Sequence, residues 1–395
     1  MSATTTARAA EILAAVRELS STVSARAEEI EAARRVPADL HERFRELGLY
    51  RMLVPASHGG DEIGLESSLP IIETIGRADA SVAWTETIGL QSAAVFGLLP
   101  RPTFDEIYDR HGPDVTIGGS IAPVGKAHVV DGGYRVEPGR WPFASGCHNW
   151  DFLFGNCIVC QDGRPVPDPG GAGPLTRVMV FPRHQAQILD TWRTLGLRGT
   201  GSNHFTLASE LFVPAEYACV SMLEEDAQID LPGLFRYPII EFTFHICAGL
   251  IGLGQGTIDD FAALATSRTR KKSARSVAEL PAVQHRIGSA EAALSATRDA
   301  LQLRARQLGS SELGGDYKDL VVKTWAFNAR AADLVVDIVQ GCFRMYGADA
   351  IWDGHPLHRR LRDAFTIVQH ASMNDQSLTR SGAGLLGQSV GLTFT

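Results

Sequence analysis

The segment FRELGLYRMLVPASHGG, residues 44–60, begins as an amphipathic helix and ends in a loop. Leu40, Phe44 and Leu47 recur at helical spacing, so we expect one face of this helix to be buried. The Val-Pro and Gly-Gly pairs in its second half are typical of a helix end followed by a turn. Helical spacing also continues toward the N-terminus, at Ala9, Ile12, Leu13, Val16 and Leu19. The N-terminal part of the sequence is therefore predicted to be helical.

The pattern changes twice further along the sequence. Between residues 115 and 213, short β-branched and apolar runs alternate with turns such as Gly132-Gly133, which predicts a small barrel or sandwich. From Pro238 to about Gln388 the helical spacing returns, most clearly over Tyr317–Met345. The predicted order is a helical domain over residues 1–114, a central β-domain over residues 115–218 and a helical bundle over residues 219–395.

Composition and charge exclude several classes of protein. The chain has 395 residues, of which 45% are hydrophobic and 21% are charged, so it can bury a core of its own. Lys and Arg total 37 and Asp and Glu total 45, which gives a net charge of −8. A nucleic-acid binder normally carries a basic surface instead. The one compact basic run, residues 268–275, is typical of a solvated helix end, so we expect no nucleic-acid partner.

The sequence also argues against secretion, a membrane span and a metal site. Residues 1–17 lack a continuous apolar core, and the most apolar run, residues 245–253, is too short to cross a bilayer. We therefore expect a cytoplasmic protein with no membrane partner. Cys157 and Cys160 fall in a predicted buried strand and have no second pair, so we expect neither a disulfide framework nor a metal. The six cysteines are spread widely along the chain.

Three motifs, in this order along the chain, resemble those of the acyl-CoA dehydrogenase superfamily. They are the helix-to-loop segment 44–60, Leu195-Gly-Leu-Arg-Gly-Thr-Gly-Ser202 followed by Leu211-Phe-Val-Pro214, and Arg359-Arg-Leu-Arg-Asp363. The resemblance covers nearly the whole chain. It implies a mainly α fold with a central β-domain, in which a helical domain precedes a small β-barrel and a four-helix bundle follows it.

One position separates two chemistries within that superfamily. The ninth residue after Arg362, where dehydrogenases usually carry the catalytic Glu, is Ala371, and a methyl group cannot take the α-proton of a thioester. The chain instead contains Trp141-Pro-Phe-Ala-Ser-Gly146 and a segment that runs from His355-Pro-Leu to His370. These two elements resemble motifs of the two-component flavin-dependent monooxygenases, which form another branch of the superfamily.

This resemblance implies which residues surround the flavin. In that branch, reduced flavin and O2 form a C4a-(hydro)peroxyflavin, whose N5 hydrogen must be held while water is kept out. Ser145 is the implied hydroxyl at N5, next to Gly146, because a serine can both donate and accept a hydrogen bond. Trp141 and Phe143 are implied to wall the ring. His370 is implied to be catalytic, either as the base for a phenol or indole or as the hydrogen-bond partner of the peroxide.

The flavin phosphate and adenine contacts are less defined in the sequence. Arg268 stands where the superfamily supplies an arginine to the flavin phosphate of a neighbouring subunit, and Thr200 and Ser202 resemble a polar loop beside the flavin. Gly252-x-Gly254-x-Gly256 lacks the strand and spacing of a dinucleotide fingerprint, so we interpret it as close helix packing. The turn after Gln340 departs from the dehydrogenase pattern, which leaves both FMN and FAD open.

We therefore predict an oxygenase that takes diffusible reduced FAD or FMN from a separate NAD(P)H-dependent flavin reductase and oxygenates an aromatic substrate with O2. The resemblance also implies a homotetramer. Gln91 and Ser92 stand where several such oxygenases carry a histidine, so substrate contacts are expected to differ. Two alternatives stay open: an FAD-dependent acyl-CoA dehydrogenase whose base is relocated, for instance to Glu241 or Glu291, and a non-catalytic relative kept for binding.

Overall fold

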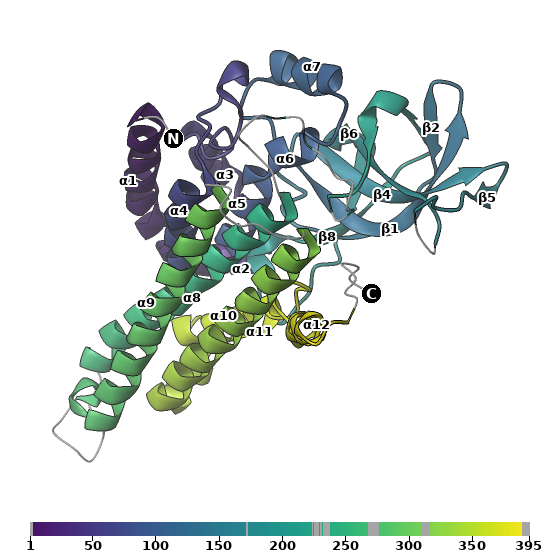
Figure 1. Ribbon diagram of the computed structural model, residues 1–395. Coiled ribbons are helices and arrows are strands. Elements are labelled where there is room, and N and C mark those ends of the chain that lie inside the picture. Colours follow the sequence, from purple (N-terminus) through teal and green to yellow (C-terminus); the bar gives the residue numbers. More distant parts are fainter. Residues whose placement is uncertain are drawn as a thin grey trace.

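The computed structural model describes residues 3–170, 173–222, 224, 229, 231, 238–267, 276–309 and 317–388. Helices form both ends of the chain and strands form its middle, which confirms the predicted fold class (Figure 1). The N-terminal helices are α1 (Ala3–Ala25), α2 (Ala27–Ala33), α3 (Ala38–Glu46), α4 (Leu65–Ala78), α5 (Ala80–Leu90), α6 (Ser92–Phe96) and α7 (Arg101–His111). The predicted boundary at residue 114 falls between α7 and the first strand.

The described strands of the central domain form two sheets. The larger has strand order β10-β6-β4-β1-β2-β9, with β5 paired to β4, and the smaller has the order β3-β8-β7. Their strands are β1 (Ile117–Val130), β2 (Gly133–Val136), β3 (Trp141–Ala144), β4 (Phe152–Gln161), β5 (Arg164–Pro165), β6 (Thr176–Pro182), β7 (Ala186–Leu189), β8 (Asn203–Leu207), β9 (Leu211–Pro214) and β10 (Ala218–Cys219). Among the described strands, only β1 and β4 pair in parallel, and their register shifts between Ser120 and Gly125.

The C-terminal helices are α8 (Pro238–Ser267), α9 (Pro281–Gly309), α10 (Tyr317–Tyr346), α11 (Pro356–Ile367) and α12 (Asp375–Leu385). Figure 1 shows α8, α9 and α10 as long neighbouring helices that project away from the β-domain. Among the described helices, one segment of α8, Ile239–Thr266, is long and apolar enough to cross a membrane, but 83% of its most apolar window is buried inside the fold. This burial is typical of the core helix of a bundle.

Glycines let α8 pack directly against α4. A Cβ added at Gly76 would lie 2.3 Å from the carbonyl oxygen of Gly249, and one at Gly252 would lie 2.2 Å from the carbonyl oxygen of Glu73. A Cβ at Gly256 would lie 2.2 Å from the carbonyl oxygen of Arg77. The interpretation of this glycine series as close helix packing is therefore confirmed for Gly252 and Gly256.

Helix α11 holds the loop that precedes β8. The carboxylate of Asp363 accepts a hydrogen bond from the backbone N–H of Leu197 at 2.6 Å, and the guanidinium of Arg362 donates to the carbonyl oxygen of Leu195 at 3.1 Å. A Cβ at Gly196 would lie 2.1 Å from the carbonyl oxygen of Arg362, so the loop and the helix are in direct backbone contact. The Arg-Asp pair of the sequence motif thus joins the helical bundle to the β-domain.

Candidate active site

Ser145 lies in a tight turn directly after β3. Its backbone N–H donates to the carbonyl oxygen of Phe143 at 3.0 Å, and the N–H of Gly146 donates to the carbonyl oxygen of Thr200 at 2.8 Å. Gly146 has φ +67°, and a Cβ there would lie 2.2 Å from the ring of Trp150. Only glycine fits this position without strain. The turn therefore fixes the backbone that carries the Ser145 hydroxyl.

Three buried hydroxyl groups form a continuous row, which we call the hydroxyl row: Ser145, Ser202 and Thr200. The Oγ atoms of Ser145 and Ser202 are 2.7 Å apart, and Ser202 Oγ lies 2.6 Å from Thr200 Oγ1. The hydroxyl of Thr200 donates to the carbonyl oxygen of Leu197 at 2.9 Å. Three of the residues predicted to lie near the flavin are thus brought together by the fold, although they are up to 57 positions apart in the sequence.

Trp84 joins this row to His370. The indole N–H of Trp84, on α5, donates to Ser145 Oγ at 3.0 Å. The imidazole of His370, in the turn after α11, lies edge-to-face against the same indole, with ring centroids 5.2 Å apart and an interplanar angle of 74°. Ser145 and His370, predicted separately, therefore contact one shared side chain. Trp84 was not predicted from the sequence as a site residue.

The hydrogen bonds of His370 define its tautomer. The backbone N–H of Ser372 can only donate, and it lies 3.4 Å from Nδ1 of His370, while Ser372 Oγ lies 2.8 Å from the same nitrogen. Nδ1 is therefore assigned as an acceptor, which leaves the ring proton on Nε2. Burial lowers the pKa of His370 to about 4, so the ring is neutral at pH 7. No hydrogen bond joins Nε2 to a described residue, and this N–H can donate to a bound molecule.

Phe143 and Trp141 differ sharply in accessibility. The side chain of Phe143 is 66% exposed at φ +60°, with its ring edge-to-face against Trp192, so it can contact a bound molecule. Trp141 is 0% exposed, stacks on Phe205 with centroids 5.2 Å apart, and donates its indole N–H to a backbone carbonyl of β4. The prediction that Trp141 walls a flavin ring is therefore wrong for this structure, because the indole fills the interior of the β-domain.

The described residues fit a flavin at this position. An isoalloxazine ring is flat and largely apolar with polar atoms along one edge, and the site offers an exposed Phe143 ring beside the buried hydroxyl of Ser145. Phe143 is a non-glycine residue in the left-handed region, a form of backbone strain that clusters at functional sites. Arg268, the residue expected to hold the flavin phosphate, lies outside the described residues.

The described part of the chain contains no group of three or more His, Cys, Asp or Glu side chains able to hold a metal ion. His355 instead caps α11, where its Nδ1 accepts the N–H of Leu357 at 3.3 Å. Cys157 and Cys160 are both buried in β4, and burial raises the pKa of the Cys157 thiol to about 12. Neither His355 nor the Cys157–Cys160 pair belongs to a metal ligand set among the described residues.

The two residues that replace the expected histidine have different surroundings. Ser92 donates to the carbonyl oxygen of Gly89 at 2.6 Å and accepts the N–H of Ile117 at 2.9 Å, so it fastens α6 to β1. The side-chain amide of Gln91 lies 3.0 Å from Nδ1 of the buried His245. Because this Nδ1 donates to the carbonyl oxygen of Glu241 at 2.9 Å, the amide oxygen of Gln91 is assigned to the contact. The other end of the amide is buried and has no hydrogen-bond partner among the described residues. A buried amide group without a partner is costly, and a polar atom of a ligand would satisfy it.

The carboxylates considered as relocated dehydrogenase bases do not join this cluster. Glu291 is exposed on α9 and accepts a hydrogen bond from the side chain of Gln255 at 3.0 Å. Glu241 lies in the first turn of α8, where its backbone carbonyl oxygen is 2.9 Å from Nδ1 of His245. Ala371 directly follows His370 in the turn that contacts Trp84. The described cluster therefore contains an imidazole and hydroxyls where a dehydrogenase needs a carboxylate.

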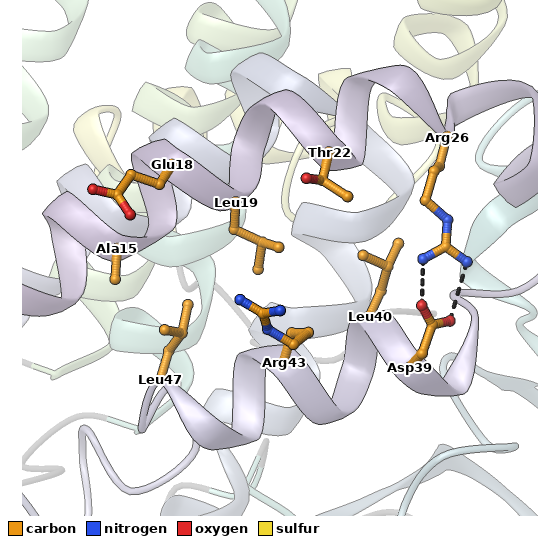
Figure 2. A pocket seen from close by; sticks show the side chains of 9 residues that line it. All are labelled: Ala15, Glu18, Leu19, Thr22, Arg26, Asp39, Leu40, Arg43 and Leu47. Carbon is orange, nitrogen blue, oxygen red and sulfur yellow. Dashed lines mark hydrogen bonds and ion pairs between the residues drawn. The ribbon is translucent and has the colours of Figure 1, made fainter.

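A hollow of about 450 Å³ lies away from this cluster, between α1 and α3 (Figure 2). Leu19, Leu40 and Leu47 line it, and the side chain of Arg26 closes one end through a two-pronged ion pair with Asp39, with distances of 2.5 and 3.0 Å. None of the predicted site residues lines it. We interpret this hollow as a groove between two packed helices and not as the place of the reaction.

Comparison with known proteins agrees with this geometry. Residues 6–102 match the N-terminal domain of acyl-CoA dehydrogenase, and residues 244–375 match the C-terminal domain of acyl-CoA dehydrogenase. The second match includes α11 and His370, and the first includes Trp84. Both helical parts of the candidate site thus lie within family-specific segments.

Curated relatives carry monooxygenase names. The chain is 30% identical to indole-3-acetate monooxygenase of Pseudomonas putida over 92% of this chain and 90% of that protein. It is 28% identical to the oxygenase component of the FADH2-dependent resorcinol hydroxylase of Rhizobium sp. strain MTP-10005, over 91% of this chain and 90% of that protein. Both alignments span nearly the full length of each protein.

Solved structures give the same result. The crystal structure of 3-HSA hydroxylase from Rhodococcus sp. RHA1 superposes with a TM-score of 0.81 and 26% identity, and the match covers 98% of this chain and 99% of that chain. The predicted resemblance is therefore confirmed. The chain belongs to the acyl-CoA dehydrogenase-like family of two-component flavin-dependent monooxygenases, as an oxygenase component that acts on aromatic substrates.

Proposed function

We propose that this chain takes reduced FAD or FMN from a separate NAD(P)H-dependent flavin reductase and uses O2 to insert one oxygen atom into a phenol, an indole or a polycyclic heteroaromatic compound. When bound, the reduced flavin supplies the electrons that activate O2. The observation that carries the proposal is the contact of Ser145 and His370 with one indole, that of Trp84. The same residues support a role for the protein in protecting activated oxygen from water.

Ser145 holds the polar edge of the flavin in this proposal. Ser145 is only 8% exposed, and Trp84 and Ser202 already hold its hydroxyl by hydrogen bonds. A hydrogen bond to N5 therefore needs little further ordering of the Ser145 side chain. One such bond is worth about 0.5–1.5 kcal/mol net. Each 1.36 kcal/mol changes a rate about tenfold, so removal of this hydrogen bond is expected to accelerate the release of hydrogen peroxide about 2- to 12-fold.

His370 acts as a hydrogen-bond donor in this proposal. Its pKa of about 4 makes it a weak base at pH 7, and its proton lies on Nε2, the nitrogen that has no described partner. Through this N–H a neutral imidazole would donate a hydrogen bond to oxygen bound beside the flavin. Of the two predicted roles for His370, the structure supports donation better than deprotonation of the substrate.

The substrate class rests on two further observations. The relatives named above act on indole-3-acetate and resorcinol, aromatic rings that carry an N–H or O–H group. In this chain the unpartnered end of the Gln91 side-chain amide can donate a hydrogen bond to an oxygen substituent of such a ring. We therefore propose that Gln91 orients the polar substituent of the ring.

Oxygen isotopes test the proposed function directly. The protein is incubated with a flavin reductase, NADH, FMN or FAD, and a panel of indoles, phenols and polycyclic heteroaromatics under ¹⁸O2. A product that carries one ¹⁸O atom supports the proposal. Bleaching of bound oxidised FAD by an acyl-CoA, without oxygenated product, supports the dehydrogenase alternative instead. A protein that binds no flavin in either redox state would indicate the non-catalytic relative.

Assembly and location belong to the same proposal. We propose a homotetramer, which the family resemblance supports, and a location in the cytoplasm. Light scattering of the purified protein tests the assembly, and a mass near that of one or two chains would contradict it.

A further inference from the structure

The hydroxyl row has a direction that follows from its last member. The carbonyl oxygen of Leu197 can only accept, and it also receives the indole N–H of Trp192 at 2.9 Å and the backbone N–H of Thr200 at 3.2 Å. Since Thr200 Oγ1 lies 2.9 Å from the same oxygen, we assign the single proton of Thr200 to this contact. Thr200 Oγ1 must then accept from Ser202, because the two oxygens are 2.6 Å apart and Thr200 has no second proton. Ser202 has now used its own proton, so Ser145 must donate to Ser202 across their 2.7 Å contact. Every proton in the row therefore points away from Ser145.

The remaining capacity of Ser145 follows from the same count. A serine hydroxyl has one proton and two acceptor positions. The proton goes to Ser202, and one acceptor position receives the indole N–H of Trp84 at 3.0 Å. Among the described residues no other group occupies the second acceptor position. Ser145 thus presents an acceptor, and not a donor, to a bound molecule.

We infer that the hydroxyl row makes this site prefer reduced over oxidised flavin, with Ser202 and Thr200 as positioning residues that act through Ser145. N5 of a reduced flavin carries a hydrogen and donates, whereas N5 of an oxidised flavin carries a lone pair and accepts. When Ser145 can only accept, it forms a hydrogen bond with the N5 hydrogen of reduced flavin. Against oxidised flavin, a lone pair of Ser145 faces the lone pair of N5 and no hydrogen bond forms. This inference rests on the proposed contact between Ser145 and N5.

The preference has a use in a two-component system. Reduced flavin must be captured from solution and oxidised flavin must leave after each turnover. A site that discriminates by the direction of its hydrogen bonds favours both steps without moving any backbone. The carbonyl oxygen of Leu197 sets the direction of the hydroxyl row. Helix α11 holds the backbone of Leu197 through Asp363.

Thr200→Val tests the inference, because valine has a similar shape and no hydroxyl. Without Thr200 Oγ1, the proton of Ser202 is free to turn toward Ser145, and Ser145 can then donate to N5 of oxidised flavin. We expect the ratio of the dissociation constants for oxidised and reduced FMN or FAD to fall about 2- to 12-fold, mainly through tighter binding of the oxidised form. The measurement is anaerobic fluorescence or calorimetric titration with each redox state, so it does not depend on turnover.

Three variants serve as controls. Ser202→Ala removes the acceptor for Ser145 itself and is expected to lower the same ratio, which keeps the test valid if Thr200→Val folds poorly. Thr200→Ser keeps the hydroxyl and is expected to restore the wild-type ratio. Thr85→Val removes a neighbouring buried hydroxyl that donates to the carbonyl oxygen of Ser81 at 2.9 Å and lies outside the row, so its ratio is expected to match the wild type.

The outcomes separate this inference from the proposed function. A wild-type protein that prefers reduced flavin, with a ratio that falls in Thr200→Val and Ser202→Ala but not in Thr85→Val, supports the inference. A ratio unchanged in both row variants overturns it, even if the protein is an active oxygenase. Equal wild-type affinity for the two redox states also overturns it and leaves flavin binding intact. Failure of the wild type to bind either redox state removes the proposed function and the inference together.

Discussion

Replacement of Trp84 by phenylalanine isolates one hydrogen bond in the candidate site. The variant loses the indole N–H that donates to Ser145 Oγ at 3.0 Å and keeps an aromatic ring against His370. A neutral hydrogen bond of this kind contributes about 0.5–1.5 kcal/mol net. Ser145 is then held only by Ser202 and can rotate, so contact with N5 is made less often.

The expected change is about a 2- to 12-fold faster release of hydrogen peroxide, since each 1.36 kcal/mol corresponds to a factor of about ten in rate. The assay loads the protein with reduced FMN or FAD under anaerobic conditions, mixes it with oxygenated buffer without substrate, and follows peroxide by a coupled peroxidase. Trp352→Phe provides a matched control, because Trp352 is 69% exposed and this variant makes the same substitution on the surface. Peroxide release equal to the wild type in Trp84→Phe, while Ser145→Ala accelerates it, would refute the assigned role of the indole.

Three other predictions concern stability. Gly146→Ala places a Cβ 2.2 Å from the Trp150 ring at φ +67°, so urea denaturation should show a free energy of unfolding lower by at least about 2 kcal/mol. Gly163→Ala is the control, because Gly163 has φ +75° but no atom within 4 Å, and it should lower the free energy of unfolding by only about 1 kcal/mol. Equal losses in the two variants would contradict the steric argument. Asp363→Ala leaves the N–H of Leu197 without its acceptor and should cost about 1–3 kcal/mol in thermal unfolding, and an unchanged melting temperature would show that α11 does not hold the loop. Burial lowers the pKa of His245 to about 4 from the usual 6.5, so the unfolded chain binds more protons between these values. His245 alone should therefore lower stability by up to about 3 kcal/mol as pH drops from 6.5 to 4, in addition to the contribution of His370. His245→Gln should remove its share of this slope, and a slope parallel to that of the wild type would contradict the assignment.

The sequence was sufficient to predict the order of the domains, and it singled out two residues, Ser145 and His370, that contact the same indole in the structure. The change from helical spacing to strand alternation near residue 115 lies between α7 and β1, because these periods reflect which side chains each element buries. Ser145 and His370 were predicted from two motifs far apart in the chain. Their meeting at Trp84 could not be predicted, since it depends on how α5, β3 and α11 pack in three dimensions.

Trp141 shows why a motif alone can mislead. It occupies the expected place in the Trp-x-Phe-x-Ser-Gly segment, yet its ring fills a space left by two glycines on neighbouring strands. A Cβ would lie 2.4 Å from the indole at Gly125 and 2.7 Å at Gly155. The pairing of β1 with β4 brings these glycines together, and one sequence does not reveal that pairing. The direction of the hydroxyl row was equally hidden, because it depends on the carbonyl oxygen of Leu197.

The most direct test of the account compares the wild type with Ser145→Ala after each is loaded with reduced flavin and mixed with O2. The quantity measured is the rate of hydrogen peroxide release in the absence of substrate. We predict slow release from the wild type and release about 2- to 12-fold faster from Ser145→Ala, because the variant loses one hydrogen bond to N5. Equal rates in the two proteins would contradict the central role of Ser145. Tight retention of oxidised FAD that an acyl-CoA reduces would contradict the oxygenase itself.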